Sequence, residues 1–340
     1  MLAASVITRL SAIGAGLALM AAVPGNVQAQ EEFILAHGFG TDHFTHPVGL
    51  HFSELLEEAS GGTMVVDYHP GGDLGDYIQQ FEQAMRGGIP MTLTGPATDI
   101  DARLNIGYLA YIVDDWDSAR ELYGPGGSMI EIMGNVLDEL NLELIGMIPG
   151  GFGGIAVRVG VDRRPTSFPE DGAGFKMRVP PFEIGVKRFD AWGFSPMPIP
   201  YSELYTALQL GTVDGRSFGP PTEIIEMHDA ISAYIRTRDY FDTSIWVANK
   251  DWLAGLTDEQ RGWIDAAAEA ALAAAWEEGE RKELDDLGRI KEYGIEVIEL
   301  TPEELESAKA IVYETEWPWM ATIVGEDLMA DVRTAAGLDQ

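Results

Sequence analysis

The chain has 340 residues, with 22 basic and 55 acidic side chains, 46% hydrophobic residues and no cysteine. The length fits two domains and the apolar content is sufficient for packed cores, which excludes wholesale disorder. The net charge of −33 argues against nucleic acids and anionic membrane surfaces as partners, because both would repel the chain. Without cysteine, the chain has no disulfides, thiolate metal sites or cysteine nucleophiles.

Residues 1–29 have the pattern of an export signal. One charged side chain, Arg9, precedes an apolar stretch over 10–23, which is shorter than the ~20 residues that a membrane-spanning helix needs. Val27 and Ala29 supply the small residues of a cleavage site. We therefore predict a signal peptide cleaved near Ala29 and an exported, periplasmic protein. The alternative is a buried N-terminal helix, but the segment has neither a capping residue nor a polar face.

The remaining chain alternates short β-type runs with amphipathic helices, a pattern typical of α/β domains. The helices are recognised by apolar residues at helical spacing that end at glycines, and the strands by short apolar runs. In chain order we expect a strand at 33–36, a helix at about 44–59, a strand at 64–68, a helix at about 77–86, a strand at 91–94, a helix at 128–140 and strands at 143–147, 155–159 and 176–179. A helix at about 202–210, a long helix at about 257–293, a strand at 295–300 and a last helix after Thr301 complete the prediction.

Four glycines within 150–154 indicate a flexible crossing between two units. The long helix opens with the capping box Thr257-Asp258-Glu259-Gln260 and exceeds the width of one small domain. Two units joined by several crossings predict a cleft with a hinge. We expect a first domain over 30–152 plus about 243–282, a second over 153–242 plus about 283–330, and a helix over about 257–293 that spans both.

One short motif suggests a serine hydrolase. Gly215-Arg216-Ser217-Phe218-Gly219 matches the G-x-S-x-G nucleophile elbow, in which Ser217 would be the nucleophile. An elbow requires a strand-to-helix turn, whereas this match follows a helix and is followed by two prolines. Only His228 lies after the serine, too close to leave room for the usual acid between them. We therefore keep an exported hydrolase only as a distant alternative and predict no catalytic residue.

Histidines of the N-terminal part are candidate metal ligands. His43 and His46, and His46 and His51, are spaced three and five residues apart around a helix start, so they do not converge well on one ion. The chain has no H-E-x-x-H motif. We predict neither a metal nor a cofactor.

Two arginines at the ends of short strands are candidate ligand contacts. Arg158 lies in the apolar run 155–159, and Arg178 lies near the end of the short run 175–179. A guanidinium is suited to a carboxylate because its planar fork makes two parallel charge-assisted hydrogen bonds. From spacing alone, the alternative for each is an exposed strand arginine.

Four segments from 174 onward resemble the hallmark sequences of the DctP-like family, the solute receptors of TRAP (tripartite ATP-independent periplasmic) transporters. The resemblance covers essentially the whole mature chain, and the helix from Thr257 matches the interdomain helix of that family. The segment His69–Gly75 is similar to the first-domain pattern. The hallmark segments are Gly174–Pro180 (GFKMRVP), Trp192–Pro198 (WGFSPMP), Tyr201–Gln209 (YSELYTALQ) and Gly211–Gly215 (GTVDG).

The resemblance implies the two-domain α/β fold of periplasmic binding proteins, with a hinged cleft that closes over a small organic acid. It implies delivery of this carboxylate to the small and large membrane subunits of a TRAP transporter, and it implies a monomer without catalysis or cofactor. A receptor of an ATP-driven transporter would share the architecture but would lack the Lys-Met-Arg and Ser-Glu-Leu-Tyr signatures.

The resemblance also implies the roles of individual residues. Arg178 occupies the position that holds the ligand carboxylate in relatives, and Arg158 the position of an assisting arginine. Tyr201 corresponds to an aromatic residue that packs on the ligand. The further ligand-binding residues implied in this way are His37, Thr94, Gly95 and Tyr240.

Phe218 is a departure from the family pattern, because relatives commonly have a ligand-binding asparagine at that position. A phenyl ring cannot replace the hydrogen bonds of an amide. Phe218 therefore predicts a ligand with fewer polar groups at this point, such as a monocarboxylate with an apolar or aromatic body. Ser217 or Arg216 could also take over the polar contact.

Overall fold

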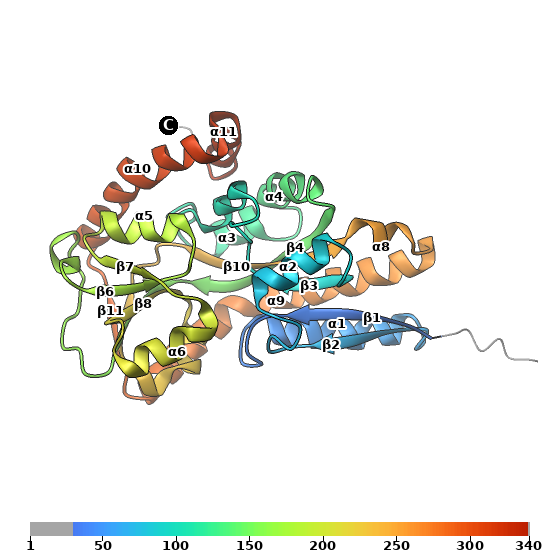
Figure 1. Ribbon diagram of the computed structural model, residues 1–340, viewed down its shortest axis with the longest axis horizontal. Coiled ribbons are helices and arrows are strands. Elements are labelled where there is room, and N and C mark those ends of the chain that lie inside the picture. The colour runs from blue at the N-terminus through green and yellow to red at the C-terminus, as the bar shows by residue number, and fades with distance from the viewer. Residues whose placement is uncertain (1–29, 339–340) are drawn as a thin grey trace, which may run out of the picture.

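The computed structural model describes residues 30–338, and the predicted signal peptide lies outside this range. Two β-sheets form the framework, each with helices packed on it (Figure 1). This arrangement is the α/β class that the alternation of strands and helices predicts. None of the helices within the described residues is long and apolar enough to cross a membrane.

The first sheet has five strands in the order β2-β1-β3-β10-β4. Strands β2 and β3 pair in parallel with β1, whereas β10 runs antiparallel to both β3 and β4. The strands are β1 (Glu31–His37), β2 (Met64–His69), β3 (Met91–Thr94), β4 (Leu142–Phe152) and β10 (Phe241–Asn249). The helical elements of this half are α1 (Thr45–Ala59), α2 (Tyr77–Met85), the 3-10 segment η1 (Ala102–Tyr108), α3 (Trp116–Tyr123), α4 (Ser128–Asp138) and α8 (Lys250–Ala254).

The second sheet has six strands in the order β11-β9-β5-β8-β6-β7. Strands β6 and β8 are parallel, but β5 is antiparallel to β8, so β5 and β6 run in opposite directions. The strands are β5 (Gly154–Arg158), β6 (Lys176–Val179), β7 (Ser195–Pro198), β8 (Gly215–Gly219), β9 (Ile231–Arg236) and β11 (Glu296–Glu299). The other elements of this half are η2 (Glu170–Gly172), α5 (Glu183–Ala191), α6 (Tyr201–Leu210), α7 (Pro221–Glu226) and η3 (His228–Ala230).

Two short backbone crossings lead from one sheet to the other, between β4 and β5 and between β9 and β10. They lie side by side, because the Gly153 amide donates to the Tyr240 carbonyl oxygen at 2.9 Å and the Arg238 amide donates to the Gly153 carbonyl oxygen at 3.1 Å. A Cβ atom at position 153 would lie 2.1 Å from the ring of Tyr240. Only glycine fits there, which explains one of the four glycines within residues 150–154.

The long helix α9 (Asp258–Glu292) packs on both halves (Figure 1). It contacts α1 and β4 on the first side and α7 and β11 on the second. Its start follows from the sequence, because the Thr257 side chain accepts a hydrogen bond from the Gln260 amide and the Gln260 side chain closes the capping box. The helix therefore gives the two halves a common support.

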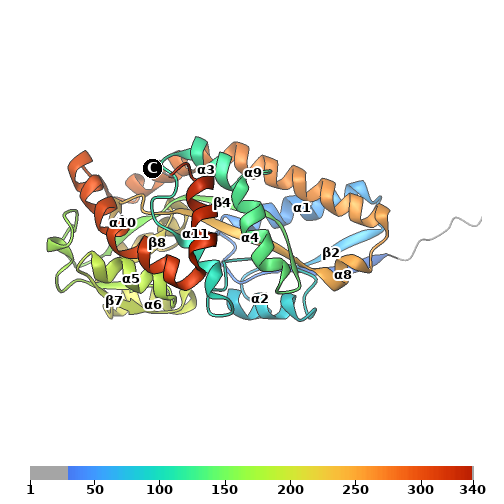
Figure 2. The ribbon, with the colours of Figure 1, turned by 90° about the horizontal axis from the view of Figure 1, so that it is seen from above.

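The C-terminal helices return to the first half. Helix α10 (Pro302–Val324) packs on α5 and on η1, and α11 (Glu326–Ala335) packs on α4. Figure 2 shows α10 and α11 as a chain of red helices that extends from α5 to α4. The segment 283–330, which we expected in the second domain, thus contacts both halves.

A buried ion cluster joins α10 to the second half and to the crossing. Arg188 on α5 donates to Glu316 on α10 (Nε to Oε2, 2.7 Å) and to Asp239 in the β9–β10 crossing (Nη1 to Oδ2, 2.8 Å). Glu316 also accepts the Ala110 amide at 2.9 Å. All three charged side chains are inaccessible to solvent. Each charge has a partner, which compensates for its desolvation.

Candidate functional site

A cavity of about 60 Å³ lies between the two halves. By the same measure a single water needs roughly 10–15 Å³, so the cavity has room for several waters or one small organic molecule. The first half contributes Phe39, His43, Tyr77, Gly95 and Tyr108; the second contributes Arg178, Pro180, Phe182, Tyr201, Phe218 and Glu223; the second crossing and β10 contribute Tyr240, Asp242, Thr243 and Ser244.

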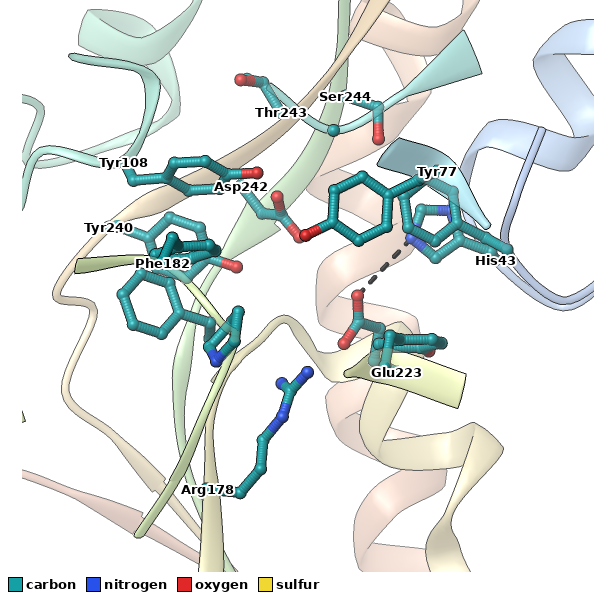
Figure 3. Close-up of a pocket in the computed structure, with 15 residues that line it drawn as sticks. His43, Tyr77, Tyr108, Arg178, Phe182, Glu223, Tyr240, Asp242, Thr243 and Ser244 are labelled. Carbon is teal, nitrogen blue, oxygen red and sulfur yellow. Dashed lines mark ion pairs between the residues drawn. The ribbon is translucent and has the colours of Figure 1, made fainter. Parts of the chain in front are cut away.

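Arg178 points its guanidinium into this space from β6 (Figure 3). Strand alternation explains the direction, because Met177 and Val179 belong to the hydrophobic core and Arg178 faces the other way. The side chain is 2% exposed, and its Nε atom donates to the Ile199 carbonyl oxygen at 2.9 Å. Among residues 30–338, no acceptor is bonded to its two terminal nitrogens and no acidic side chain pairs with it.

Burial, together with the charge of Arg216, lowers the pKa of Arg178 from its ordinary value to about 10. The side chain therefore remains protonated at neutral pH. A desolvated cation without a directly bonded counterion is unfavourable. It is also the arrangement that favours binding of an anion through the free side of the guanidinium fork.

Arg216, by contrast, has its counterion within the protein. It lies next to Arg178 in the sheet, where β6 and β8 pair in register. Its Nη2 atom donates to Glu223 and, at 2.7 Å, to the Phe218 carbonyl oxygen. Burial alone would raise the pKa of Glu223, but the charge of Arg216 and the contacts with His43 and Arg216 together outweigh burial and hold this pKa below its ordinary value. Arg178 is thus the cation of this pair that is available to a ligand.

Contacts between the halves enclose the cavity. His43 Nε2, at the start of α1, lies 3.5 Å from Glu223 Oε1 on α7 (Figure 3). The ring of Tyr108 stacks on that of Phe182 with 4.4 Å between their centroids, and Phe39 meets the edge of Tyr201 at 6.0 Å. These pairs hold the two halves together beside the cavity.

Asp242 occupies the opposite side of the cavity from Arg178 (Figure 3). Burial raises the pKa of its carboxyl well above the ordinary value, and the negative charge of Glu223 adds to this effect. The hydroxyl of Tyr240 donates a hydrogen bond to the carboxyl. The cavity therefore has a basic end at Arg178 and an acidic end at Asp242.

Of the residues that the sequence predicts for the site, Arg178, Tyr201, Phe218, Tyr240 and Gly95 line the cavity. The ring of Phe218 lies between the cavity and the ion cluster, 4.8 Å from the Tyr240 ring and 4.7 Å from Arg188 Cζ. The backbone at Phe218 is left-handed, with φ of 55°. Asparagine tolerates this conformation better than phenylalanine, in agreement with the asparagine that the family resemblance implies at this position.

Arg158 does not line this cavity, in contrast to its predicted assisting role. Because β5 runs opposite to β6, the C-terminal end of β5 lies beside the N-terminal ends of β8 and β6, whereas Arg178 lies near the C-terminal end of β6. There Arg158 is half-buried and its Nη1 donates to the Val159 carbonyl oxygen at 2.8 Å. The spacing of two arginines in the sequence does not reveal the direction of their strands.

His37 and Thr94 also lie outside the cavity lining. His37 is fully buried and its Nε2 atom lies 3.2 Å from Nδ1 of His46, in a hydrogen bond whose direction depends on the tautomers. Burial lowers the pKa of His37 to about 3, and His43 and His46 contribute to this effect. Thr94 donates to the backbone carbonyl oxygen of Tyr77 at 2.9 Å. Both residues support the wall of the cavity and do not form it.

Ser217 does not lie in a nucleophile elbow. It is fully buried in strand β8, and its hydroxyl donates to the backbone carbonyl oxygen of Arg178 at 2.8 Å. The G-x-S-x-G match is therefore part of a strand and helps to fix the position of β6. No group of three or more acidic or histidine side chains within the described residues is placed to hold a metal ion.

Several lining residues were missed from the sequence. Tyr77 follows the cap residue Asp76 of α2, and Tyr108 ends η1, but neither position has a local signal that points to a cleft. Asp242 lies two residues after Tyr240, so the prediction that Tyr240 binds the ligand could have been extended to Asp242. Phe182 and Glu223 come to the site only through the packing of the two halves.

The family model "Bacterial extracellular solute-binding protein, family 7" (DctP) matches residues 35–316. The chain belongs to this family, which confirms the resemblance to TRAP solute receptors and the fold class. A solute-binding protein of Roseobacter denitrificans is 25% identical and aligns over 86% of this chain and 89% of its own length. The C4-dicarboxylate-binding periplasmic protein DctP of Rhodobacter capsulatus is 26% identical over 84% of each chain.

Solved structures agree with the fold. The sugar-acid-binding protein DctPAm of Advenella mimigardefordensis, in complex with galactonate, superposes with a TM-score of 0.83. The superposition covers 91% of this chain and 98% of the DctPAm chain, and the two sequences are 22% identical. The family consists of solute-binding proteins and not of enzymes, and its match favours a TRAP-type receptor over a receptor of an ATP-driven transporter.

Proposed function

We propose that this chain is a periplasmic receptor that captures a small organic acid between its two halves and delivers it to the membrane subunits of a TRAP transporter. The observation that carries the proposal is Arg178, a buried guanidinium whose terminal nitrogens face the cavity without an internal counterion. A ligand carboxylate would supply the missing charge through two parallel hydrogen bonds.

The aromatic walls of the cavity favour a compact ligand with a ring or an apolar body. Tyr201 and Phe218, together with five other aromatic residues, provide flat surfaces for packing. The similar proteins bind a C4-dicarboxylate and galactonate, according to their names. These solutes have a carboxylate in common, which agrees with the proposed role of Arg178.

Closure of the two halves would couple binding to recognition by the transporter. Opening would separate His43 from Glu223 and the Tyr108 ring from that of Phe182, and would return the Arg178 side chain to water. In the closed form, exclusion of water strengthens the ion pair between Arg178 and the ligand. A ligand therefore shifts the population toward the closed form, which is the form that the membrane subunits would receive.

A thermal-shift screen of organic acids tests this function. A ligand that binds only the folded chain raises the melting temperature. We expect one or more small carboxylates to do so, and the corresponding uncharged amides to have no effect, because an amide leaves the charge of Arg178 unpaired. Equal shifts for acids and amides would contradict the proposal. Transport in proteoliposomes that contain the small and large subunits then tests the delivery step.

A further inference from the structure

Arg188 lies behind two walls of the cavity without reaching the open space. Its Nη2 atom donates to the carbonyl oxygen of Tyr108, and its Cζ atom lies 4.7 Å from the centre of the Phe218 ring. Both rings line the cavity, whereas Arg188 does not line it and is inaccessible to solvent. Tyr108 ends η1 in the first half, and Phe218 belongs to β8 in the second. One guanidinium therefore contacts an aromatic wall from each half.

The backbone that leaves η1 is held in place by the same ion cluster. Tyr111 has a left-handed backbone, with φ of 55°, which is unfavourable for a residue with a side chain and requires support from its surroundings. The Ala110 amide donates to the Glu316 carboxylate at 2.9 Å, and the Tyr111 amide donates to the Asp239 carbonyl oxygen at 2.9 Å. Glu316 and Asp239 are the two counterions of Arg188. The cluster therefore fixes the segment that carries the tyrosine ring at the end of η1.

The contacts of Arg188 are ones that only a planar guanidinium can combine. Nε and Nη2 donate to the two carboxylate oxygens of Glu316 at 2.7 and 3.0 Å, and Nη1 donates to Asp239 at 2.8 Å. Nη2 also donates to Tyr108, and Cζ lies over the ring of Phe218. A lysine ammonium is a single point charge and cannot make all these contacts at once. The residue type thus fits a role that depends on geometry as well as on charge.

The rings in front of Arg188 are closely packed with one another. The Tyr108 ring stacks on that of Phe182 at 4.4 Å between centroids (Figure 3), and the Phe182 ring meets the Phe218 ring edge to face at 5.2 Å. Closely packed groups have little room to move independently and transmit displacements to their neighbours. A shift of Tyr108 or Phe218 would therefore change the shape of the cavity wall.

We propose that Arg188 is a positioning residue for ligand binding, which fixes the Tyr108 and Phe218 rings so that they pack on the body of the ligand. This inference rests on the proposed function, in which Arg178 holds the carboxylate. It also gives a reason for a buried ion cluster that stability alone does not explain, because replacement of such a cluster by apolar residues is often neutral or stabilising. Changes at Arg188 should weaken the binding of acids that have a ring and leave the contact between Arg178 and a carboxylate unchanged.

Two fluorinated acids provide the test. 4-Fluorobenzoate has a carboxylate on a flat ring, whereas trifluoroacetate has a carboxylate without a ring. Fluorine NMR titration with the full mature chain at pH 7.5 measures the Kd of each acid. Arg188→Lys retains the charge between the two acids of the cluster but loses the fork. We expect it to raise the Kd of 4-fluorobenzoate about tenfold and to leave the Kd of trifluoroacetate within about twofold of the wild type.

Arg236→Lys is the matched control, because Arg236 also lies in the second half and pairs with two acids, Glu283 and Glu299, but does not line the cavity. It should leave both Kd values within about twofold of the wild type. If Arg188→Lys does not fold by circular dichroism, the triple variant Arg188→Met, Asp239→Asn, Glu316→Gln removes all charges of the cluster together and should show the same pattern.

The outcomes separate this inference from the proposed function. If 4-fluorobenzoate binds the folded Arg188 variant as tightly as the wild type, or if both acids lose affinity equally, the inference is wrong and the proposed function stands. If both Arg188 variants are unfolded, the cluster serves the fold itself and the inference is again wrong. If neither acid binds the wild type, the proposed function fails for acids of this size, and the inference fails with it.

Discussion

Replacement of Arg178 by methionine should make the ligand-free protein more stable while it removes ligand binding. Folding lowers the pKa of Arg178 from its ordinary value to about 10, and at about 1.4 kcal/mol per pKa unit this shift corresponds to a folding penalty of roughly 3 kcal/mol. Because the side chain is a base whose folded-state pKa is lowered, this penalty is present at every pH below about 10.

Methionine removes the penalty but also loses the hydrogen bond from Nε to the Ile199 carbonyl oxygen, worth about 1 kcal/mol. The net expectation for Arg178→Met is a gain of about 2 kcal/mol in the free energy of unfolding. Binding of a carboxylate should weaken by about 2–5 kcal/mol, or roughly 30-fold to several thousand-fold in Kd.

The assay combines urea unfolding of the ligand-free chain with calorimetric titration of a carboxylate from the thermal-shift screen. Arg158→Met is the matched control, because it removes the same side chain from a strand end outside the cavity. Its Kd should stay within about twofold of the wild type. A destabilised Arg178→Met protein that still binds the acid with unchanged Kd would refute the role of Arg178.

Three further outcomes follow from the buried groups. The pKa of His37 is about 3 in the folded chain and 6.5 in the unfolded chain, so between pH 7 and pH 4 only the unfolded chain takes up a proton at this residue. The free energy of unfolding should therefore fall by roughly 3 kcal/mol from pH 7 to pH 4. His37→Gln should reduce this loss, as measured by urea unfolding at both pH values. Glu316→Gln should cost about 1–3 kcal/mol, because it weakens the charge-assisted hydrogen bonds from Arg188 while Asp239 still pairs with this arginine. Glu314→Gln, on the exposed side of the same helix, should have little effect, and equal costs by the same method would contradict this expectation. Phe218→Asn relieves the left-handed backbone but loses the ring contacts, so a net loss of about 2–4 kcal/mol is expected, and a gain in melting temperature would show that strain dominates.

Local chemistry determined which elements could be predicted from the sequence. The helix α9 was expected over about 257–293 and is found at Asp258–Glu292, because a capping box and a terminal glycine act within a few residues. Strands β8, β9 and β10 were missed, since their identity depends on pairing with strands far away in the sequence.

The candidate site, too, could be predicted only where local sequence determines the position of a residue. Arg178 could be predicted because its motif is specific and strand alternation directs its side chain. Arg158 does not line the cavity, because its position depends on the antiparallel direction of β5, which the local sequence does not encode. Asp242 and Tyr108 reach the cavity only when the two halves meet, so no single segment carries their signal.

A crystal structure of the chain with the acid that gives the largest thermal shift tests the role of Arg178 most directly. We predict that both oxygens of the ligand carboxylate lie about 2.7–2.9 Å from the two terminal nitrogens of Arg178, between the two sheets. A carboxylate bound to other groups, with the Arg178 guanidinium turned away from it, would contradict the account.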